Sequence, residues 1–151
     1  MREYAYATAP AKIILFGEHA VVYGRPAIAV PVTKLTATVE IITEPELSPG
    51  TIQIEAPDID LKSNLADLPG DYPLNVAIQA FKGHSGIKQI PPCFIKISSS
   101  IPVASGMGSG AAVSVALFRS LAAYFDMPLS KQEISELTFE VEKIHHGLPS
   151  G

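Results

Sequence analysis

The longest apolar segment of the chain, residues 111–125, constrains the fold more than any other feature. Arg119 is its only charged residue, so the segment predicts a helix that is buried on most of its surface. A second helix is predicted over residues 131–145, because Ser130 and Glu133 have the spacing of a capping box. Strand-like segments come before both helices, and this order predicts an α+β fold.

The strand-like segments are short and alternate apolar with polar residues. Residues 36–42 and 51–55 are expected to pair as a hairpin, and residues 94–98 form a further strand. The remaining predictions are β structure at residues 4–9 and 12–16, loops at 17–31 and 83–92, irregular chain at 58–71, and a helix at 74–81.

Length and composition describe one globular domain. The chain has 151 residues, 47% hydrophobic and 17% charged, and a single core fits this size. The net charge of −4 and the scattered basic residues argue against a nucleic-acid-binding surface. No apolar run approaches a membrane span and the N-terminus lacks a signal-peptide pattern, so we expect a cytoplasmic protein. Cys93 is the only cysteine, which excludes an internal disulfide.

A glycine-rich segment, Pro-Val-Ala-Ser-Gly-Met-Gly-Ser-Gly-Ala-Ala at residues 102–112, lies between a predicted strand and a predicted helix. Small residues let backbone N–H groups approach an anion, and the helix start adds donors and partial positive charge. The segment therefore predicts a phosphate site, although a plain tight turn would use the same glycines. A P-loop is excluded because no lysine follows Gly110.

A dinucleotide-binding fingerprint is the other alternative for this segment. Gly106, Gly108 and Ala111 match its spacing, and Asp126 lies near the distance of the ribose-binding acid. That fingerprint opens directly at a strand end, and its acid ends a second strand. Here residues 99–105 separate strand and glycines, and Asp126 ends a predicted helix. The fingerprint is therefore rejected.

A second group of polar residues lies near the N-terminus. Lys12 begins a short apolar strand, and Glu18 and His19 follow at its exit. Taken alone, the pattern fits a lysine that extends to solvent and two solvated side chains as well as it fits a site.

Three segments together resemble the GHMP family of small-molecule kinases. They are Gly-Glu-His-Ala-Val-Val-Tyr-Gly at residues 17–24, the glycine-rich segment, and His-Gly-Leu-Pro-Ser-Gly at residues 146–151. The first is similar to the mevalonate kinases of that family. The resemblance implies a ribosomal-protein-S5-domain-2-like fold, with a mixed sheet and helices on one face. It also implies transfer of the ATP γ-phosphoryl group to the primary hydroxyl of mevalonate, in isoprenoid biosynthesis.

The resemblance also implies roles for individual residues. Lys12 would lie beside the transferred phosphoryl group as a catalytic and substrate-binding residue, and Glu18 and His19 would line the acceptor site. Glu142, with Ser109, would bind Mg²⁺. The residues that match the family's ATP-phosphate-binding motif are Pro102, Gly106, Met107, Gly108, Ser109, Gly110, Ala111 and Ala112.

The predicted last helix gives independent support for Glu142. Its apolar stripe separates Glu142 from the flank that carries Glu133, Glu136, Glu140 and Lys143. Glu142 therefore lies away from the ordinary charged face, although a solvated surface glutamate would also fit.

Two departures from the family are visible. Gly110 replaces the second serine of the family motif, which leaves open whether Ser109, a water or Glu142 alone serves magnesium. The family's catalytic aspartate would lie two residues beyond Gly151, where the sequence ends. We therefore expect a truncated N-terminal domain, without the C-terminal GHMP domain and inactive by itself.

The alternatives are another GHMP kinase, acting on phosphomevalonate or a sugar, and a non-catalytic nucleotide-binding module. The expected partners are ATP and mevalonate, with no nucleic acid and no membrane. The sequence leaves the oligomeric state open, including a homodimer.

Overall fold

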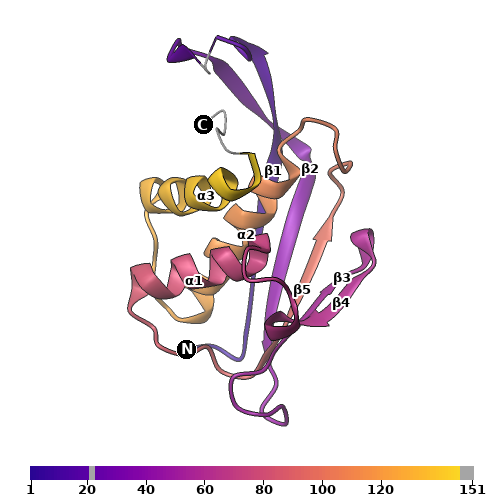
Figure 1. Ribbon diagram of the computed structural model, residues 1–151, viewed down its shortest axis with the longest axis vertical. Coiled ribbons are helices and arrows are strands. Elements are labelled where there is room, and N and C mark those ends of the chain that lie inside the picture. The colour runs from indigo at the N-terminus through magenta and orange to yellow at the C-terminus, as the bar shows by residue number, and fades with distance from the viewer. Residues whose placement is uncertain (21–22, 147–151) are drawn as a thin grey trace.

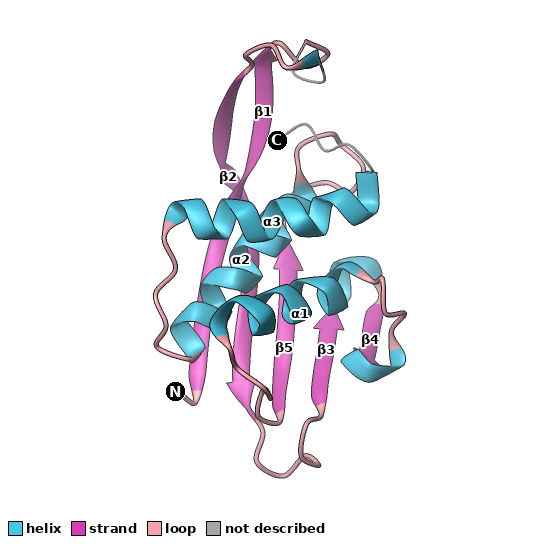
Figure 2. Ribbon diagram, turned by 60° about the vertical axis from the view of Figure 1, so that its left-hand side comes forward, coloured by secondary structure: helices cyan, strands magenta, loops and turns pink. Residues whose placement is uncertain are grey.

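The computed structural model describes residues 1–20 and 23–146, with the side chains of residues 145 and 146 left aside. It is an α+β fold in which helices cover one face of a five-stranded sheet (Figures 1 and 2). In chain order the elements are β1 (Tyr4–Phe16), β2 (Ile28–Thr43), β3 (Ile52–Ala56), η2 (Pro57–Ile59), β4 (Leu61–Asn64), η3 (Leu65–Asp67), α1 (Pro73–Ser85), β5 (Cys93–Ser99), α2 (Ser109–Tyr124) and α3 (Lys131–His146). None of the helices in these described residues is long and apolar enough to cross a membrane.

Strands β1 and β2 are the longest elements of the sheet. They pair antiparallel from Tyr4 and Ile42 onward, with a shift of register between Pro10 and Ala11. Beyond that shift the two strands extend past the helices as a two-stranded projection (Figure 2). We call this projection, residues 11–16 and 28–32, the arm. The predicted loop at residues 17–31 is therefore too long, because β2 already begins at Ile28.

The predicted hairpin between residues 36–42 and 51–55 is wrong. The sheet order is β1-β2-β5-β3-β4, so β5 lies between the two segments. Strand β3 pairs parallel with β5 and antiparallel with β4, a strand inside the stretch predicted to be irregular. The parallel pair needs a crossover, and α1 lies within it. Alternation identified β3 as a strand but carries no information on which strand pairs with it.

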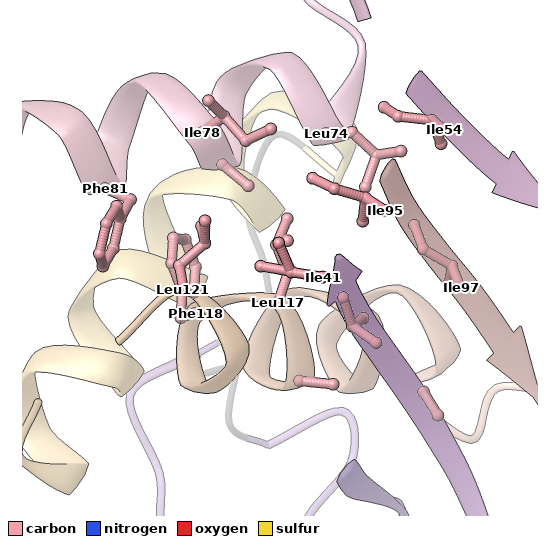
Figure 3. Packing of buried hydrophobic residues seen from close by; sticks show 14 of the residues in the cluster. Ile41, Ile54, Leu74, Ile78, Phe81, Ile95, Ile97, Leu117, Phe118 and Leu121 are labelled. Carbon is pink, nitrogen blue, oxygen red and sulfur yellow. The ribbon is translucent and has the colours of Figure 1, made fainter. Parts of the chain in front are cut away.

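Helix α2 is the centre of the core, as its apolar sequence predicted. Leu117, Phe118 and Leu121 have no exposed surface and face α1 on one side and the sheet on the other (Figure 3). Its buried hydroxyl at Ser120 donates to the carbonyl oxygen of Val39 at 2.7 Å, which ties the helix to β2. Truncating any one of these large side chains to alanine would cost about 2–5 kcal/mol, so the position of α2 is firmly fixed.

Helix α3 begins with the predicted capping box. The Ser130 N–H donates to Glu133 Oε2 at 2.7 Å, and the Glu133 N–H donates to Ser130 Oγ at 3.2 Å. These hydrogen bonds from Ser130 lower the pKa of the Glu133 carboxyl. The same carboxylate lies 3.2 Å from His84 Nε2 on α1. The start of α3 at Glu133 therefore lies beside α1.

Candidate functional site

The loop between β5 and α2 carries the glycine-rich segment. Its backbone enters the left-handed region at Ala104, Gly106 and Gly108, with φ of 56°, 72° and 69°. The Ser105 hydroxyl donates to the carbonyl oxygen of Pro102 at 2.7 Å, closing the tight turn in which the loop begins. The glycines are therefore used for backbone conformation, which the turn interpretation required, and the loop delivers the chain directly to the start of α2.

The start of α2 has backbone donors with no partner inside the helix. Gly108 is the N-cap and no side chain caps the helix. The first intrahelical bond runs from the Ala112 N–H to the Gly108 carbonyl oxygen at 2.9 Å. The N–H groups of Ser109, Gly110 and Ala111 precede it, and such groups, with the helix dipole, bind anions. Ala112, a predicted phosphate-binding residue, is buried and already uses its N–H.

Lys12 lies directly against this loop. Its backbone N–H donates to the carbonyl oxygen of Met107 at 3.0 Å, which joins β1 to the loop. Its side chain passes over Gly108, because a methyl group added there would lie 3.2 Å from Lys12 Cε and 3.3 Å from Cγ. The absence of a side chain at Gly108 thus lets the lysine run along the loop toward the start of α2.

Glu142 reaches the same place from α3. A methyl group added at Gly110 would lie 3.4 Å from Glu142 Oε1, so the carboxylate is beside the first turn of α2. Glu142 is half-buried, whereas Glu136, Glu140 and Lys143 on the same helix are exposed. This confirms the prediction that Glu142 is separated from the charged flank of α3.

The chemistry of these groups fits a magnesium ion held together with phosphate oxygens. Among residues 1–20 and 23–146, no group of three or more acidic, histidine or cysteine side chains could enclose a metal by itself. Magnesium in phosphoryl-transfer sites uses one or two carboxylates, with substrate phosphates and waters completing its shell. Glu142 supplies one such carboxylate beside the helix start. Ser109, the first residue of α2, is half-buried there.

An apolar pocket of about 220 Å³ opens beside the loop. Ser109 and Gly110 form one wall, and the other walls come from β3, η2, β4, the start of α1, β5 and the loop itself. Its apolar lining includes Ile59, Leu61 and Val103, of which Ile59 and Val103 are more than half exposed. The sequence interpretation missed this pocket because it treated residues 58–71 as irregular. The isolated apolar residues at 59 and 61 were the available signal.

Glu18 and His19 lie at the end of the arm, immediately after β1, and both are exposed. Neither makes a hydrogen bond or ion pair with another described residue. The turn itself is fixed by Gly17, which has φ +88°, because a methyl group there would lie 2.7 Å from the Pro26 carbonyl oxygen. The structure thus brings Lys12 and Glu142 to the loop and leaves Glu18 and His19 on the arm.

Two other sequence features, Asp126 and the third motif, were also considered as parts of a site. Asp126, the acid considered for a dinucleotide fingerprint, instead forms ion pairs with the N-terminal amine at 3.2 Å and with Arg2 at 2.8 Å. Its pKa is lowered by the hydrogen bond from the amine and then by that from Arg2. The segment Gly147–Gly151 of the third motif lies outside the described residues.

The loop, Lys12 and Glu142 thus lie together at the start of α2. The sequence pattern described as the GHMP kinases N terminal domain matches residues 71–151, more than half of the chain. The chain belongs to the GHMP kinase family. The Lys12 strand lies before the matched residues, but Gly108, Gly110 and Glu142 lie within them.

Similar proteins within this family are mevalonate kinases. The chain is 34% identical to the mevalonate kinase of Pyrococcus horikoshii, over all of this chain and 48% of that protein. It is 38% identical to the mevalonate kinase of Archaeoglobus fulgidus, over 96% of this chain and 47% of that protein. The crystal structure of the Methanococcus jannaschii mevalonate kinase superposes with a TM-score of 0.84 at 30% identity, covering 95% of this chain and 47% of that one. The chain thus spans about half the length of the curated relatives it matches.

Proposed function

We propose that this GHMP kinase domain belongs to an ATP-dependent mevalonate kinase, which phosphorylates the primary hydroxyl of mevalonate in cytoplasmic isoprenoid biosynthesis. The observation that carries the proposal is the convergence of Lys12 and Glu142 on the uncapped start of α2. Similarity to mevalonate kinases over the whole chain supports the choice of acceptor.

The start of α2 binds the ATP phosphates in this proposal. The N–H groups of Ser109, Gly110 and Ala111 and the positive end of the helix dipole attract anionic oxygens. The neighbouring apolar pocket then accepts the nucleobase, because it shares Ser109 and Gly110 with the phosphate site. A flat, largely apolar ring gains free energy by leaving water for such a pocket.

Lys12 has the catalytic role. Its ammonium group, carried over Gly108 toward the start of α2, lies beside the γ-phosphoryl group and the attacking hydroxyl. A fixed cation there stabilises the charge that develops on the transferring oxygens and favours the alkoxide form of the acceptor. Its contribution is largest in the transition state, so it acts on kcat.

Glu142 holds the nucleotide's magnesium ion, with Ser109 as a second candidate ligand. The lack of a side chain at Gly110 leaves the Glu142 carboxylate beside the first turn of α2, where it would share a bound ion with phosphate oxygens. When bound, Mg²⁺ neutralises charge on the β- and γ-phosphates. Gly110 contributes no hydroxyl, so Glu142 would be the main protein ligand of a bound ion.

Glu18 and His19 contact mevalonate in this proposal. Their side chains are exposed on the arm, where an incoming acceptor can reach them. His19 can donate a hydrogen bond to the carboxylate of mevalonate, and Glu18 can accept one from a hydroxyl. These contacts orient the acceptor, because phosphoryl transfer depends mainly on the relative positions of hydroxyl and phosphate.

The test is an acceptor screen with the whole purified protein. ADP release is followed with ATP, Mg²⁺ and, in turn, mevalonate, phosphomevalonate and galactose. We expect turnover with mevalonate alone. Turnover with another acceptor would reassign the substrate within the GHMP kinases. ATP binding without turnover on any acceptor would instead indicate a non-catalytic nucleotide-binding module.

A further inference from the structure

The hydroxyl group of Thr138 on α3 is buried without a hydrogen bond. Within the part of the chain that the structure describes, Thr138 Oγ1 is the one buried side-chain oxygen or nitrogen without a hydrogen-bond partner. The residue is 8% exposed. A buried hydroxyl that makes no hydrogen bond destabilises the fold, and such groups in native proteins usually have a specific cause. The position of Thr138 on α3 indicates such a cause.

Thr138 precedes Glu142 by one helical turn, so both side chains are on the same face of α3. This face is the one toward α2, because Glu142 contacts Gly110 there while Glu133, on the other flank, contacts His84 of α1. The buried Thr138 therefore lies on the side of α3 that faces α2, one helical turn before Glu142.

Ser114 on α2 is a second buried hydroxyl residue in this region. It follows Gly110 by one helical turn, is only 5% exposed and lines the apolar pocket beside the loop. The end of α3 lies beside the start of α2, because Glu142 lies beside Gly110. Each of the two helices thus carries a buried hydroxyl one turn from the place where Glu142 and Gly110 meet.

We propose that Thr138 is a positioning residue for Glu142: its hydroxyl, which has no partner in this structure, donates a hydrogen bond to the carboxylate when that carboxylate holds the nucleotide's divalent cation. This inference rests on the proposed role of Glu142. A carboxylate has acceptor capacity for a donor in addition to a cation and its other contacts. Carboxylates that bind metals are themselves commonly held by hydrogen bonds, and loss of such a partner lowers metal affinity about 10–100-fold.

The test compares three variants of the whole protein. Thr138→Val keeps the shape and removes the hydroxyl, Thr138→Ser keeps the hydroxyl, and Thr138→Ala serves if valine perturbs folding. Mn²⁺ is titrated by calorimetry with a saturating non-hydrolysable ATP analogue. We expect T138V and T138A to bind Mn²⁺ about 10-fold or more weakly and T138S to match the wild type. Affinity for the analogue in EDTA should be unchanged.

The same substitution in a Glu142→Gln variant tests whether Thr138 acts through Glu142. In Glu142→Gln, adding T138V should change Mn²⁺ affinity no further, because the coupled ligand is already altered. Wild-type Mn²⁺ affinity in T138V, together with a raised Tm, would overturn the inference and mark the hydroxyl as a structural defect. A wild-type protein that binds no Mn²⁺ with the analogue would overturn the proposed function as well, so the two failures differ.

Discussion

The glycine-rich loop and the arm are built by opposite means, although both contain residues of the candidate site. The loop is enclosed: β1 bonds to it through Lys12 N–H, α2 continues from it into the core, and Glu142 lies against the first turn of that helix. The arm is a two-stranded projection whose large apolar side chains face solvent, with Phe16 71% exposed and Ile28 57% exposed. Glu18 and His19 at its end have no described partners.

Under the proposed function, the difference gives the two regions different roles. Phosphates need rigid donors, and the loop obtains rigidity from the packing of α2. The arm presents its residues with few contacts of its own, so bound acceptor or further protein would have to complete that end. Substitutions in the loop should therefore act on phosphoryl transfer and nucleotide binding, whereas substitutions in the arm should act on the acceptor.

The largest expected effect is at Lys12. In the whole protein, Lys12→Met should lower kcat about 10²–10³-fold, because it removes a cation that stabilises developing charge. The Tm should change little, since the backbone bond to Met107 remains. Steady-state kinetics and thermal melts measure both. Lys131→Met, an exposed lysine at the start of α3, is the control. A kcat near wild type in K12M would remove Lys12 from the catalytic role.

The second effect separates backbone strain from contact with the lysine. Gly108→Ala and Gly106→Ala both place alanine at positive φ, which costs about 1–2 kcal/mol. A methyl group at Gly106 meets open space, whereas one at Gly108 lies 3.2 Å from Lys12 Cε. We expect similar losses of stability, but kcat/KM about 10²-fold lower only in G108A, because the lysine is displaced. Equal kinetic losses would show that strain alone matters.

A matched pair tests the arm. Gly17→Ala places a methyl group 2.7 Å from the Pro26 carbonyl oxygen and 2.8 Å from Ala27 Cα, which forces the turn to rearrange. Gly24→Ala has a similar positive φ but meets nothing. G17A should raise the KM for mevalonate about 10-fold more than G24A does, with the KM for ATP unchanged. An equal increase for ATP would contradict the separation of the two regions.

The smallest expected effect is on stability, at the Asp126 ion pairs away from both regions. The N-terminal amine and Arg2 lower the pKa of Asp126, so its folded pKa lies below its unfolded value. Its stabilising contribution is present above the unfolded pKa of about 3.9 and is lost as pH falls through the folded pKa. Asp126→Asn should therefore lower the Tm slightly at pH 7, and the difference should vanish in acid. Thermal melts across this range measure it, and kinetics at pH 7 should not change.

Local chemistry made much of this structure predictable. The prediction of a capping box at Ser130 and Glu133 was correct, because its hydrogen bonds join residues only three apart in the sequence. Glu142 was separated from the charged flank because helical phase depends only on residue spacing. The α+β class followed from the same kind of pattern, since the apolar residues 111–125 required a buried helix.

Long-range pairing was the part that sequence could not supply. Residues 51–55 alternate correctly, yet their partner is β5, about forty residues away, and alternation is the same for either partner. The contact of Lys12 with Gly108 joins distant segments, so the residues alone left that lysine indistinguishable from a solvated one. Only the family resemblance placed it at the site. The apolar pocket was missed for the same reason, because its walls come from elements that are far apart in the sequence.

The hydrogen bond from Lys12 N–H to the Met107 carbonyl oxygen has a mechanical consequence. Lys12 belongs to β1, and β1 continues from that residue into the arm. The bond therefore couples the position of the loop to that of the arm: a displacement of the loop would move the base of the arm with it.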